Sequence, residues 1–283
     1  GSIARPMAVS RRPCGREFSS MARAGRTMRG AVWAQALGES LAQGPASTVA
    51  WMQQHTRLLK SDTYSRVGLL ELRGQACLLK LYLAKAPWQH LAFRLGYSRA
   101  LRSFDMAQAL AGRGLPVPAP RACVQVKEGM LLLMEGMPDG RDLRKLWLEP
   151  AEPGRAELFM RCAGDTLAAL HLAGFAHGDA KWSNLLWRGE EFVLVDLDAV
   201  RRVKADAGAL LSIQPRQLRD LARFSVDAEE LGATPQQYNV FLQRYCERMQ
   251  CSRELLLSEL NPAASAIRRR HAKKYGRRAT AGE

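Results

Sequence analysis

A carboxylate and an amide lie five residues apart in the segment His177-Gly178-Asp179-Ala180-Lys181-Trp182-Ser183-Asn184. A second aspartate, Asp196, comes twelve residues after Asn184, at the end of the apolar run Phe192-Val193-Leu194-Val195. A carboxylate such as Asp179 can face and orient an attacking hydroxyl, while oxygens of Asn184 and Asp196 can bind magnesium on nucleotide phosphates. Phosphoryl transfer depends on positioning and charge neutralisation, so these residues predict that chemistry.

Three more charged residues are candidates for the same chemistry. Lys80 lies inside the apolar stretch 76–83, where a lysine is out of place unless it has an anionic partner. We predict that it binds nucleotide phosphates; the alternative is an edge-strand lysine that reaches solvent. Lys181 is predicted to reach the transferring phosphate, unless it is merely solvated. Asp198 could bind a second metal ion directly or through water, or could simply cap a surface turn.

The histidines and tryptophans near this segment are expected to be structural. His177 is predicted to hold the loop through backbone hydrogen bonds rather than to transfer protons, and His171 to be a packed or surface residue. Trp182 and Trp187 lie on either side of Asn184. Aromatic faces suit sugars, so they could line an acceptor pocket, but packing under the loop is the simpler expectation.

The composition is that of a soluble globular protein. The 283 residues suffice for one two-lobed domain or two small ones, with 47% hydrophobic and 24% charged residues. No apolar run approaches the roughly 18 residues of a membrane-spanning helix, and the basic N-terminal segment lacks the apolar core of a secretory signal. Without C-x-x-C spacing, the cysteines are expected to be free thiols rather than disulfides or zinc ligands. They are Cys14, Cys77, Cys123, Cys162, Cys246 and Cys251.

The net charge of +15 is concentrated at the two ends. Residues 1–30 carry +6 and residues 268–283 carry +6, which leaves +3 for everything between them. Cationic ends attract phosphate-rich surfaces such as anionic lipid, phosphorylated glycolipid or nucleic acid. Solvated, disordered tails without a specific partner are the alternative. The chain has no aromatic–basic interleaving, so nucleic acid is not the expected partner.

The pattern along the chain predicts an α+β fold of two lobes, a small antiparallel-sheet lobe and a larger, mostly helical one. A helix is possible over Arg26–Leu41. Strands are predicted at 56–60, 67–72, 76–83, 122–127, 130–135, 185–187 and 192–196. Helices are predicted at 88–112 with a break near Gly96, at 141–148, at 155–173, and from Pro215 onward.

The boundary between the lobes is predicted near residue 136, at Gly136-Met137-Pro138-Asp139-Gly140. We expect an adenine ring to meet backbone groups near Glu135 and Met137 there. The resulting division is a basic N-terminal extension at 1–45, an N-lobe at 46–136, a C-lobe at 137–267 and a basic tail at 268–283.

Taken together, these motifs resemble those of the lipopolysaccharide core kinases, a bacterial family that phosphorylates heptose or Kdo sugars of the lipid A–inner core. The likeness covers about residues 55–225 and includes two further runs, Ser98-Arg99-Ala100-Leu101-Arg102 and Gly114-Leu115-Pro116-Val117-Pro118. The stretch Leu218–Phe224 is also similar. The resemblance implies a protein-kinase-like fold, ATP with Mg²⁺, and a sugar hydroxyl of a membrane-embedded glycolipid as acceptor. It also implies a cytoplasmic enzyme, peripheral on the anionic inner membrane, where cationic ends would help.

The chain departs from the kinase pattern at three places. No G-x-G-x-x-G occurs in the first hairpin, where Ser61, Thr63 and Arg66 could substitute. Ser103 stands where a helix acid is expected to pair with Lys80, and Asp105 lies two residues further on. No A-P-E segment follows Asp196, which favours a small or glycolipid acceptor over a protein. An aminoglycoside- or choline-type phosphotransferase and a non-catalytic kinase-like scaffold are the alternatives.

Overall fold

The computed structural model of this chain describes residues 25–150, 152–204 and 213–279. Strands and helices form two compact units, which confirms the expected α+β class. The first unit consists of residues up to Ser98 together with Arg121–Leu133, and the second of Arg99–Pro120 together with the chain from Met134 onward. Residues 1–24 of the basic N-terminal extension and residues 280–283 of the basic tail lie outside the described part.

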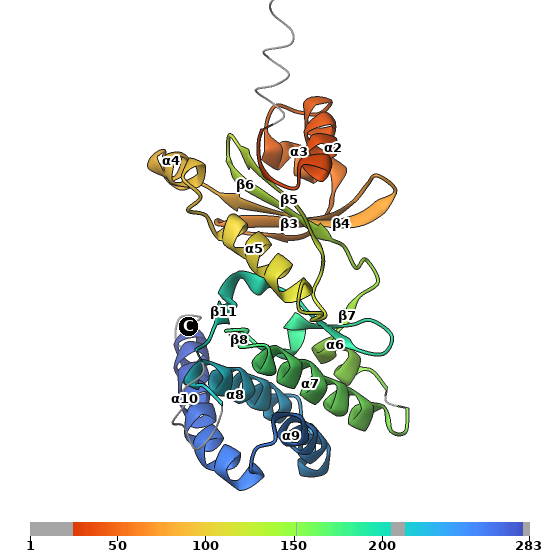
Figure 1. The fold of residues 1–283 in the computed structure, drawn as a ribbon, viewed down its shortest axis with the longest axis vertical. Helices are drawn as coiled ribbons and strands as arrows, with labels where there is room; N and C mark the ends of the chain where they lie inside the picture. Colours follow the sequence, from red (N-terminus) through yellow and green to blue (C-terminus); the bar gives the residue numbers. More distant parts are fainter. Residues whose placement is uncertain (1–24, 151, 205–212, 280–283) are drawn as a thin grey trace, which may run out of the picture. The chain divides into compact units, whose positions relative to one another are not determined.

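A six-stranded sheet forms the centre of the first unit, in the order β1-β5-β6-β4-β3-β2 (Figure 1). The pairs β1–β5, β2–β3 and β3–β4 are antiparallel. The strands are β1 Arg26–Arg29, β2 Arg57–Ser61, β3 Ser65–Leu72, β4 Gln75–Leu83, β5 Pro120–Val126 and β6 Gly129–Glu135. The helices of this unit are α2 Ala31–Ala42, α3 Thr48–His55 and α4 Trp88–Arg94.

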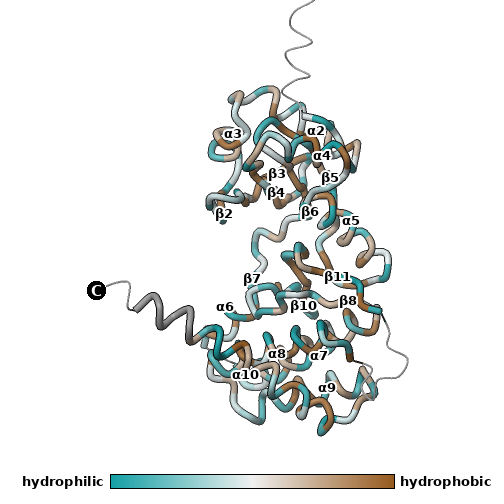
Figure 2. The backbone as a smooth tube through the Cα atoms, turned by 90° about the vertical axis from the view of Figure 1, so that its left-hand side faces the viewer, coloured by the Kyte–Doolittle hydropathy of each residue, from teal (hydrophilic) through white to brown (hydrophobic). Residues whose placement is uncertain are grey.

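Alternation along β4 determines which face of this sheet carries Lys80. Cys77, Leu79 and Leu81 are fully buried in the cluster that also contains apolar residues of α2 and α3. Side chains two residues apart share a face of a strand, so Lys80 and Tyr82 lie on the opposite face. The Lys80 Nζ is 4.8 Å from the Tyr82 ring centroid, in agreement with this placement. Hydrophobic residues concentrate along β3 and β4 (Figure 2).

The expected helix over Arg26–Leu41 is wrong in its first turn. Residues 26–29 form β1, and the helix begins only at Ala31. Gly30 separates the two with a left-handed backbone (φ 68°), and a Cβ there would lie 1.8 Å from the carbonyl oxygen of Arg121. Only glycine fits this close approach, because it has no side chain and tolerates positive φ. The strand therefore depends on contact with β5, which the local sequence does not reveal.

The second unit is mostly helical, as expected. Its helices are α5 Arg99–Ala111, α6 Leu143–Leu148, α7 Arg155–Leu172, α8 Pro215–Glu230, α9 Pro235–Met249 and α10 Arg253–Ala279. Its strands are β7 Arg141–Asp142, β8 Phe175–Ala176, β9 Leu185–Trp187, β10 Phe192–Leu194 and β11 Arg201–Arg202. The described residues of this unit also form the short 3₁₀ helices η1 Trp182–Asn184 and η2 Leu197–Ala199.

Two small sheets and two helix pairs organise this unit. The sheets have the orders β10-β9-β7 and β11-β8, while α7 packs on α9 and α8 on α10. The helix expected at 141–148 begins at Leu143, because residues 141–142 pair with β9 and the Asp142 side chain caps α6 by accepting a hydrogen bond from the Lys145 N–H at 3.0 Å.

Every described cysteine is a free thiol; Cys14 lies outside the described part. No helix among the described residues is both long and apolar enough to cross a bilayer.

Candidate active site

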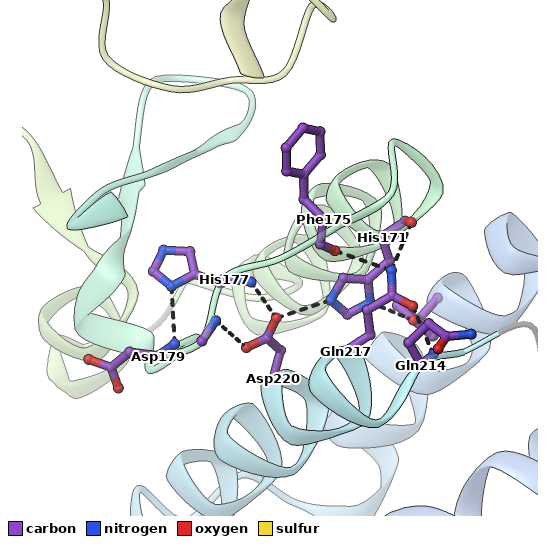
Figure 3. Close-up of polar contacts among 9 residues, drawn as sticks. His171, Phe175, His177, Asp179, Gln214, Gln217 and Asp220 are labelled. Atoms are coloured by element: carbon purple, nitrogen blue, oxygen red, sulfur yellow. Dashed lines mark hydrogen bonds and ion pairs between the residues drawn. The ribbon is translucent and has the colours of Figure 1, made fainter. Parts of the chain in front are cut away.

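The loop from His177 to Asn184 follows β8. A buried carboxylate on α8 fixes the start of this loop. Asp220 is only 1% exposed. Its Oδ1 accepts a hydrogen bond from the Gly178 N–H at 2.8 Å, and its Oδ2 accepts one from the His177 N–H at 2.5 Å (Figure 3). The Nε2–H of His171 on α7 donates to the same Oδ2 at 3.3 Å. One carboxylate thus orients two consecutive backbone amides at the start of the loop.

The position after His177 in the loop requires a glycine. Gly178 has φ 82°, and a Cβ on it would lie 2.7 Å from the carbonyl oxygen of Ala199. Any side chain would push the loop away from the segment after η2, in addition to the strain of a left-handed backbone. The Gly in the His-Gly-Asp run therefore allows the loop to approach Ala199 closely.

Hydrogen bonds assign one tautomer to His177, which is fully buried. The Val195 carbonyl lies 3.0 Å from Nε2 and can only accept, so Nε2 carries the proton. The Asp179 N–H lies 3.3 Å from Nδ1 and donates to it. A neutral imidazole satisfies both contacts, whereas a protonated ring would face an N–H with an N–H. The predicted structural role of His177 is confirmed by these backbone contacts.

We expect stability to fall below about pH 6.5 because of His177. Burial lowers the pKa of His177 from its ordinary 6.5, and this effect exceeds the opposing ones of Asp220, the Val195 carbonyl, Asp179 and Asp196. The unfolded chain then binds the proton more tightly than the folded one. The stabilisation from this group is complete above the unfolded pKa and declines as pH falls from there toward the folded pKa, at most by about 1.4 kcal/mol per pH unit.

Urea unfolding from about pH 7.5 to about pH 5 would measure this slope in the wild type and in His177→Gln. Glutamine keeps an N–H donor for the Val195 carbonyl but does not titrate, so the variant should show a shallower decline. Equal slopes in both proteins would show that His177 does not cause the pH dependence.

Asp179, Lys181 and Asn184 form a compact group in the loop. The Lys181 Nζ lies 2.8 Å from Oδ2 of Asp179. The Asn184 Nδ2–H donates to the Asp179 backbone carbonyl at 2.8 Å and approaches Oδ2 at 3.4 Å. Since the nitrogen of the Asn184 amide serves these contacts, its Oδ1 is the atom that can act as a ligand. The Asp179 side chain is 38% exposed and is accessible to a substrate.

The β9–β10 hairpin brings Asn184 next to Asp196. In its register Leu185 pairs with Leu194, and just beyond this pair the Val195 N–H donates to the Asn184 carbonyl at 3.0 Å. Asn184 and Asp196 therefore follow the same end of one hairpin. Asp196 has a left-handed backbone (φ 58°, ψ 58°), which turns the chain from β10 into η2. Such a backbone is unfavourable for a residue with a side chain and is typical of functional turns.

Asp198 is held by the first turns of α5. Its Oδ1 accepts a hydrogen bond from Ser103 Oγ at 2.7 Å, and its Oδ2 lies 3.2 Å from Nη2 of Arg99. Ser103, which stands where an acid was expected, is buried and forms this contact, whereas Asp105 lies on the exposed side of α5. A metal ion at Asp198 would compete with the Arg99 guanidinium.

Trp182 and Trp187 are packed residues, which agrees with the simpler of the two expectations for them. Trp182 is fully buried, and its indole N–H donates to the Phe224 carbonyl at 3.1 Å. Its backbone N–H donates to Asp227 Oδ2 at 2.7 Å, and burial raises the pKa of Asp227. The ring of Trp187 packs edge-on against Phe159. Helix α8 thus supports the loop at a second point.

The sequence patterns did not predict the contacts that Asp220 and Asp227 make with the loop, or the contact of Ser103 with Asp198. In the sequence, both aspartates lie on the apolar face of an amphipathic helix. This position is a signal, because a buried carboxylate requires hydrogen-bond donors. Those donors are backbone N–H groups about forty residues away in the chain, and no local pattern indicates them.

In the first unit, Lys80 is half-buried on β4, as described above. The Glu135 N–H and its Oε2 both contact Ala119, at 2.8 and 3.0 Å. The Met137 carbonyl accepts a hydrogen bond from Gly140 at 3.1 Å. The assignments of Lys80 to phosphates and of Glu135 and Met137 to adenine stay predictions.

The side chains near the hairpin end fit magnesium chemically. Carboxylate and amide oxygens are the ligands Mg²⁺ prefers, and it often takes only one or two carboxylates together with phosphates and water. Among the described residues, no group of three or more His, Cys, Asp and Glu could hold a metal ion. A cation here would therefore depend on Asn184, Asp196 and oxygens of the nucleotide.

Comparison with known proteins identifies the class of fold and the family of this chain. The chain has an antiparallel-sheet unit and a helical unit, and the helical unit carries an Asp–x₄–Asn loop followed by an Asp at the end of a strand. This combination defines a protein-kinase-like fold. Residues 49–245 match the lipopolysaccharide kinase (Kdo/WaaP) family, and the chain belongs to it. The resemblance inferred from the sequence motifs is thereby confirmed.

One curated relative is similar to part of this chain. The chain is 32% identical over 116 residues to a 3-deoxy-D-manno-octulosonic acid kinase of Xanthomonas axonopodis pv. citri (strain 306). The match covers 39% of this chain and 45% of that relative, so the chain spans less than half the length of the curated relative it matches.

Proposed function

We propose that the protein is an ATP-dependent kinase that phosphorylates a sugar hydroxyl of the lipopolysaccharide inner core, with Kdo (3-deoxy-D-manno-octulosonic acid) as the acceptor sugar. One observation carries this proposal: a single loop and a single hairpin bring Asp179, Lys181, Asn184 and Asp196 together. Family membership supports a lipopolysaccharide acceptor, and the name of the relative favours Kdo over heptose.

Each residue of the group has a role in this proposal. Asp179 orients the acceptor hydroxyl and takes its proton as the new oxygen–phosphorus bond forms and the bond from the γ-phosphorus to the departing ADP breaks. Lys181, held at 2.8 Å from that carboxylate, supplies positive charge for the transferred phosphoryl oxygens. Asn184 and Asp196 would hold magnesium, with Asp198 as a candidate for a second ion. When bound, that ion neutralises phosphate charge. We assign Lys80 to the nucleotide phosphates and backbone groups near Glu135 and Met137 to the adenine.

The acceptor lies in a membrane, and the charge of the chain suits that setting. The ends carry +6 each, and anionic lipid attracts such segments. We propose a peripheral location on the cytoplasmic face of the inner membrane, with no role for nucleic acid.

Purified protein, ATP and Mg²⁺ incubated with lipid A bearing Kdo alone, or Kdo with heptose, would test the proposed activity. We expect the Kdo-only acceptor to gain the mass of one phosphate group, and chelation of Mg²⁺ to stop the gain. Phosphorylation only of the heptose-bearing acceptor would replace Kdo by heptose. If neither acceptor reacts while an aminoglycoside or choline does, the protein is a small-molecule phosphotransferase.

A further inference from the structure

Helix α4 presents its apolar stripe to solvent. None of its residues is buried; Trp88, Leu91 and the C-cap residue Leu95 are 67%, 60% and 66% exposed. Positions 88, 91 and 95 follow the helical spacing that places side chains on one face. We call these three residues the α4 stripe. Surface helices of globular proteins normally turn such a stripe toward the core, so its outward orientation needs a partner.

The other side of α4 attaches the helix to its own unit. The His90 carbonyl accepts a hydrogen bond from Gln125 Nε2 on β5 at 3.2 Å, and the His90 and Phe93 rings pack edge to face at 5.7 Å. The first contact joins α4 to β5, whereas the second lies within the helix; His90 and Phe93 are half-buried and lie on the side of α4 opposite the stripe. The stripe is therefore exposed because the helix is anchored in that orientation.

The surroundings of the stripe match an anionic bilayer. Tyr97 next to it is exposed, and Trp, Tyr and Leu are the residues that settle at the boundary between headgroups and acyl chains. Within the first unit, the stretch 84–98 contains Lys85 and Arg94 but no Asp or Glu. Cations without acids beside an apolar stripe complement anionic headgroups.

A third exposed aromatic residue, Tyr64, extends this surface. The Lys85 Nζ lies 3.6 Å from the ring centroid of Tyr64, which follows β2 and is itself exposed. A lysine over an exposed tyrosine repeats the pairing of aromatic ring and cation that interfacial segments show.

We propose that the α4 stripe inserts into the interfacial region of an anionic phospholipid bilayer, with Lys85 and Arg94 against its headgroups. The proposal deepens the proposed function, on which it rests for its biological setting, because a lipid-anchored acceptor requires the enzyme to work at a membrane surface. It assigns the apolar part of membrane binding to α4, whereas the cationic ends contribute charge alone.

Sedimentation of the full chain with vesicles of phosphatidylcholine and phosphatidylglycerol tests this assignment. The double variant Leu91→Ser/Leu95→Ser should lower the partition coefficient by at least about tenfold. The matched control Leu148→Ser/Leu172→Ser makes the same change on leucines that are 66% and 55% exposed, and should bind like the wild type. Measurements at high salt screen the cationic ends and retain the apolar part.

Trp88 reports the depth of insertion directly. Brominated acyl chains should quench part of the wild-type tryptophan fluorescence, and Trp88→Phe should remove that part. Equal binding of both leucine pairs, or quenching that persists in Trp88→Phe, would overturn the proposal. Binding of the wild type to neither anionic nor zwitterionic vesicles would overturn it as well.

Kinase assays separate this proposal from the proposed function. A de-acylated, water-soluble acceptor should be phosphorylated equally by the wild type and by Leu91→Ser/Leu95→Ser, whereas the acceptor in vesicles should be phosphorylated more slowly by the variant. If vesicle binding depends on the α4 stripe but no acceptor is phosphorylated, the proposed kinase function is wrong and the proposed insertion of the stripe is supported. If the variant and the wild type phosphorylate the vesicle acceptor equally, the membrane surface fails and the proposed function stands.

Discussion

Asp179→Asn should lower kcat for phosphate transfer by about a hundred- to ten-thousand-fold, the usual contribution of a positioned general base. The substitution keeps the size of the side chain and the backbone contact from Asn184, which goes to the Asp179 carbonyl rather than to its side chain. It removes the carboxylate that would orient the acceptor hydroxyl. KM for ATP should change little, because Asp179 is assigned to the acceptor.

The structure also indicates that this variant folds. The Asp179 side chain is 38% exposed, and its ion pair with Lys181 is of the partly exposed kind that contributes about 0–1 kcal/mol. Glu190→Gln makes the same change of carboxylate to amide on the exposed β9–β10 turn and should retain full activity. Steady-state kinetics and thermal unfolding of both variants are the measurements. A fully active Asp179→Asn protein would remove Asp179 from the site.

Much of the candidate site could be predicted because its residues are close in sequence. Asp179 and Asn184 lie in one loop, and Asp196 follows a hairpin whose strands are visible as apolar runs. The position of Lys80 on β4 follows from alternation alone, since its neighbours Leu79 and Leu81 are fully buried.

The features that escaped prediction depend on contacts between distant segments. Strand β1 has the sequence Arg-Thr-Met-Arg, which shows no alternation, and it forms because Gly30 approaches the Arg121 carbonyl. Helix α3 has a local N-cap, Ser47, but its first residue also donates to a distant one: Glu128 accepts hydrogen bonds from the Thr48 N–H and hydroxyl at 2.8 and 2.7 Å across eighty residues. The outward orientation of α4 is likewise invisible in its sequence, where the stripe looks like an ordinary core-facing pattern.

Asp220→Ala is expected to produce the largest loss of stability. The side chain accepts hydrogen bonds from two backbone N–H groups, of His177 and Gly178, and from the imidazole of His171. The side chains of Asp220, His171 and His177 are all buried, so the donors left behind would find little water. Each unsatisfied buried donor costs about 1–3 kcal/mol, which makes the total a large part of the roughly 5–15 kcal/mol that stabilises a typical domain.

The milder variant Asp220→Asn separates stability from catalysis. An amide offers one oxygen and one NH₂ group, so at least one of the two backbone N–H groups would face another donor. We expect a loss of about 1–3 kcal/mol in the free energy of unfolding together with a lower kcat, because the loop that carries Asp179 starts at these amides. Asp179→Asn, by contrast, should lower kcat alone.

A matched control for Asp220→Asn is available on α7. Asp165 pairs with Arg244 at 2.9 Å and with Arg248 at 3.3 Å, but its side chain is 32% exposed. Asp165→Asn should therefore cost no more than about 1 kcal/mol and leave kcat unchanged. Urea unfolding and steady-state kinetics of the wild type, Asp220→Asn and Asp165→Asn are the measurements. If Asp220→Asn behaves like Asp165→Asn, the orientation of the loop that carries Asp179 does not depend on the α8 carboxylate. The backbone of β8 and the Gly178–Ala199 contact must then hold the loop instead.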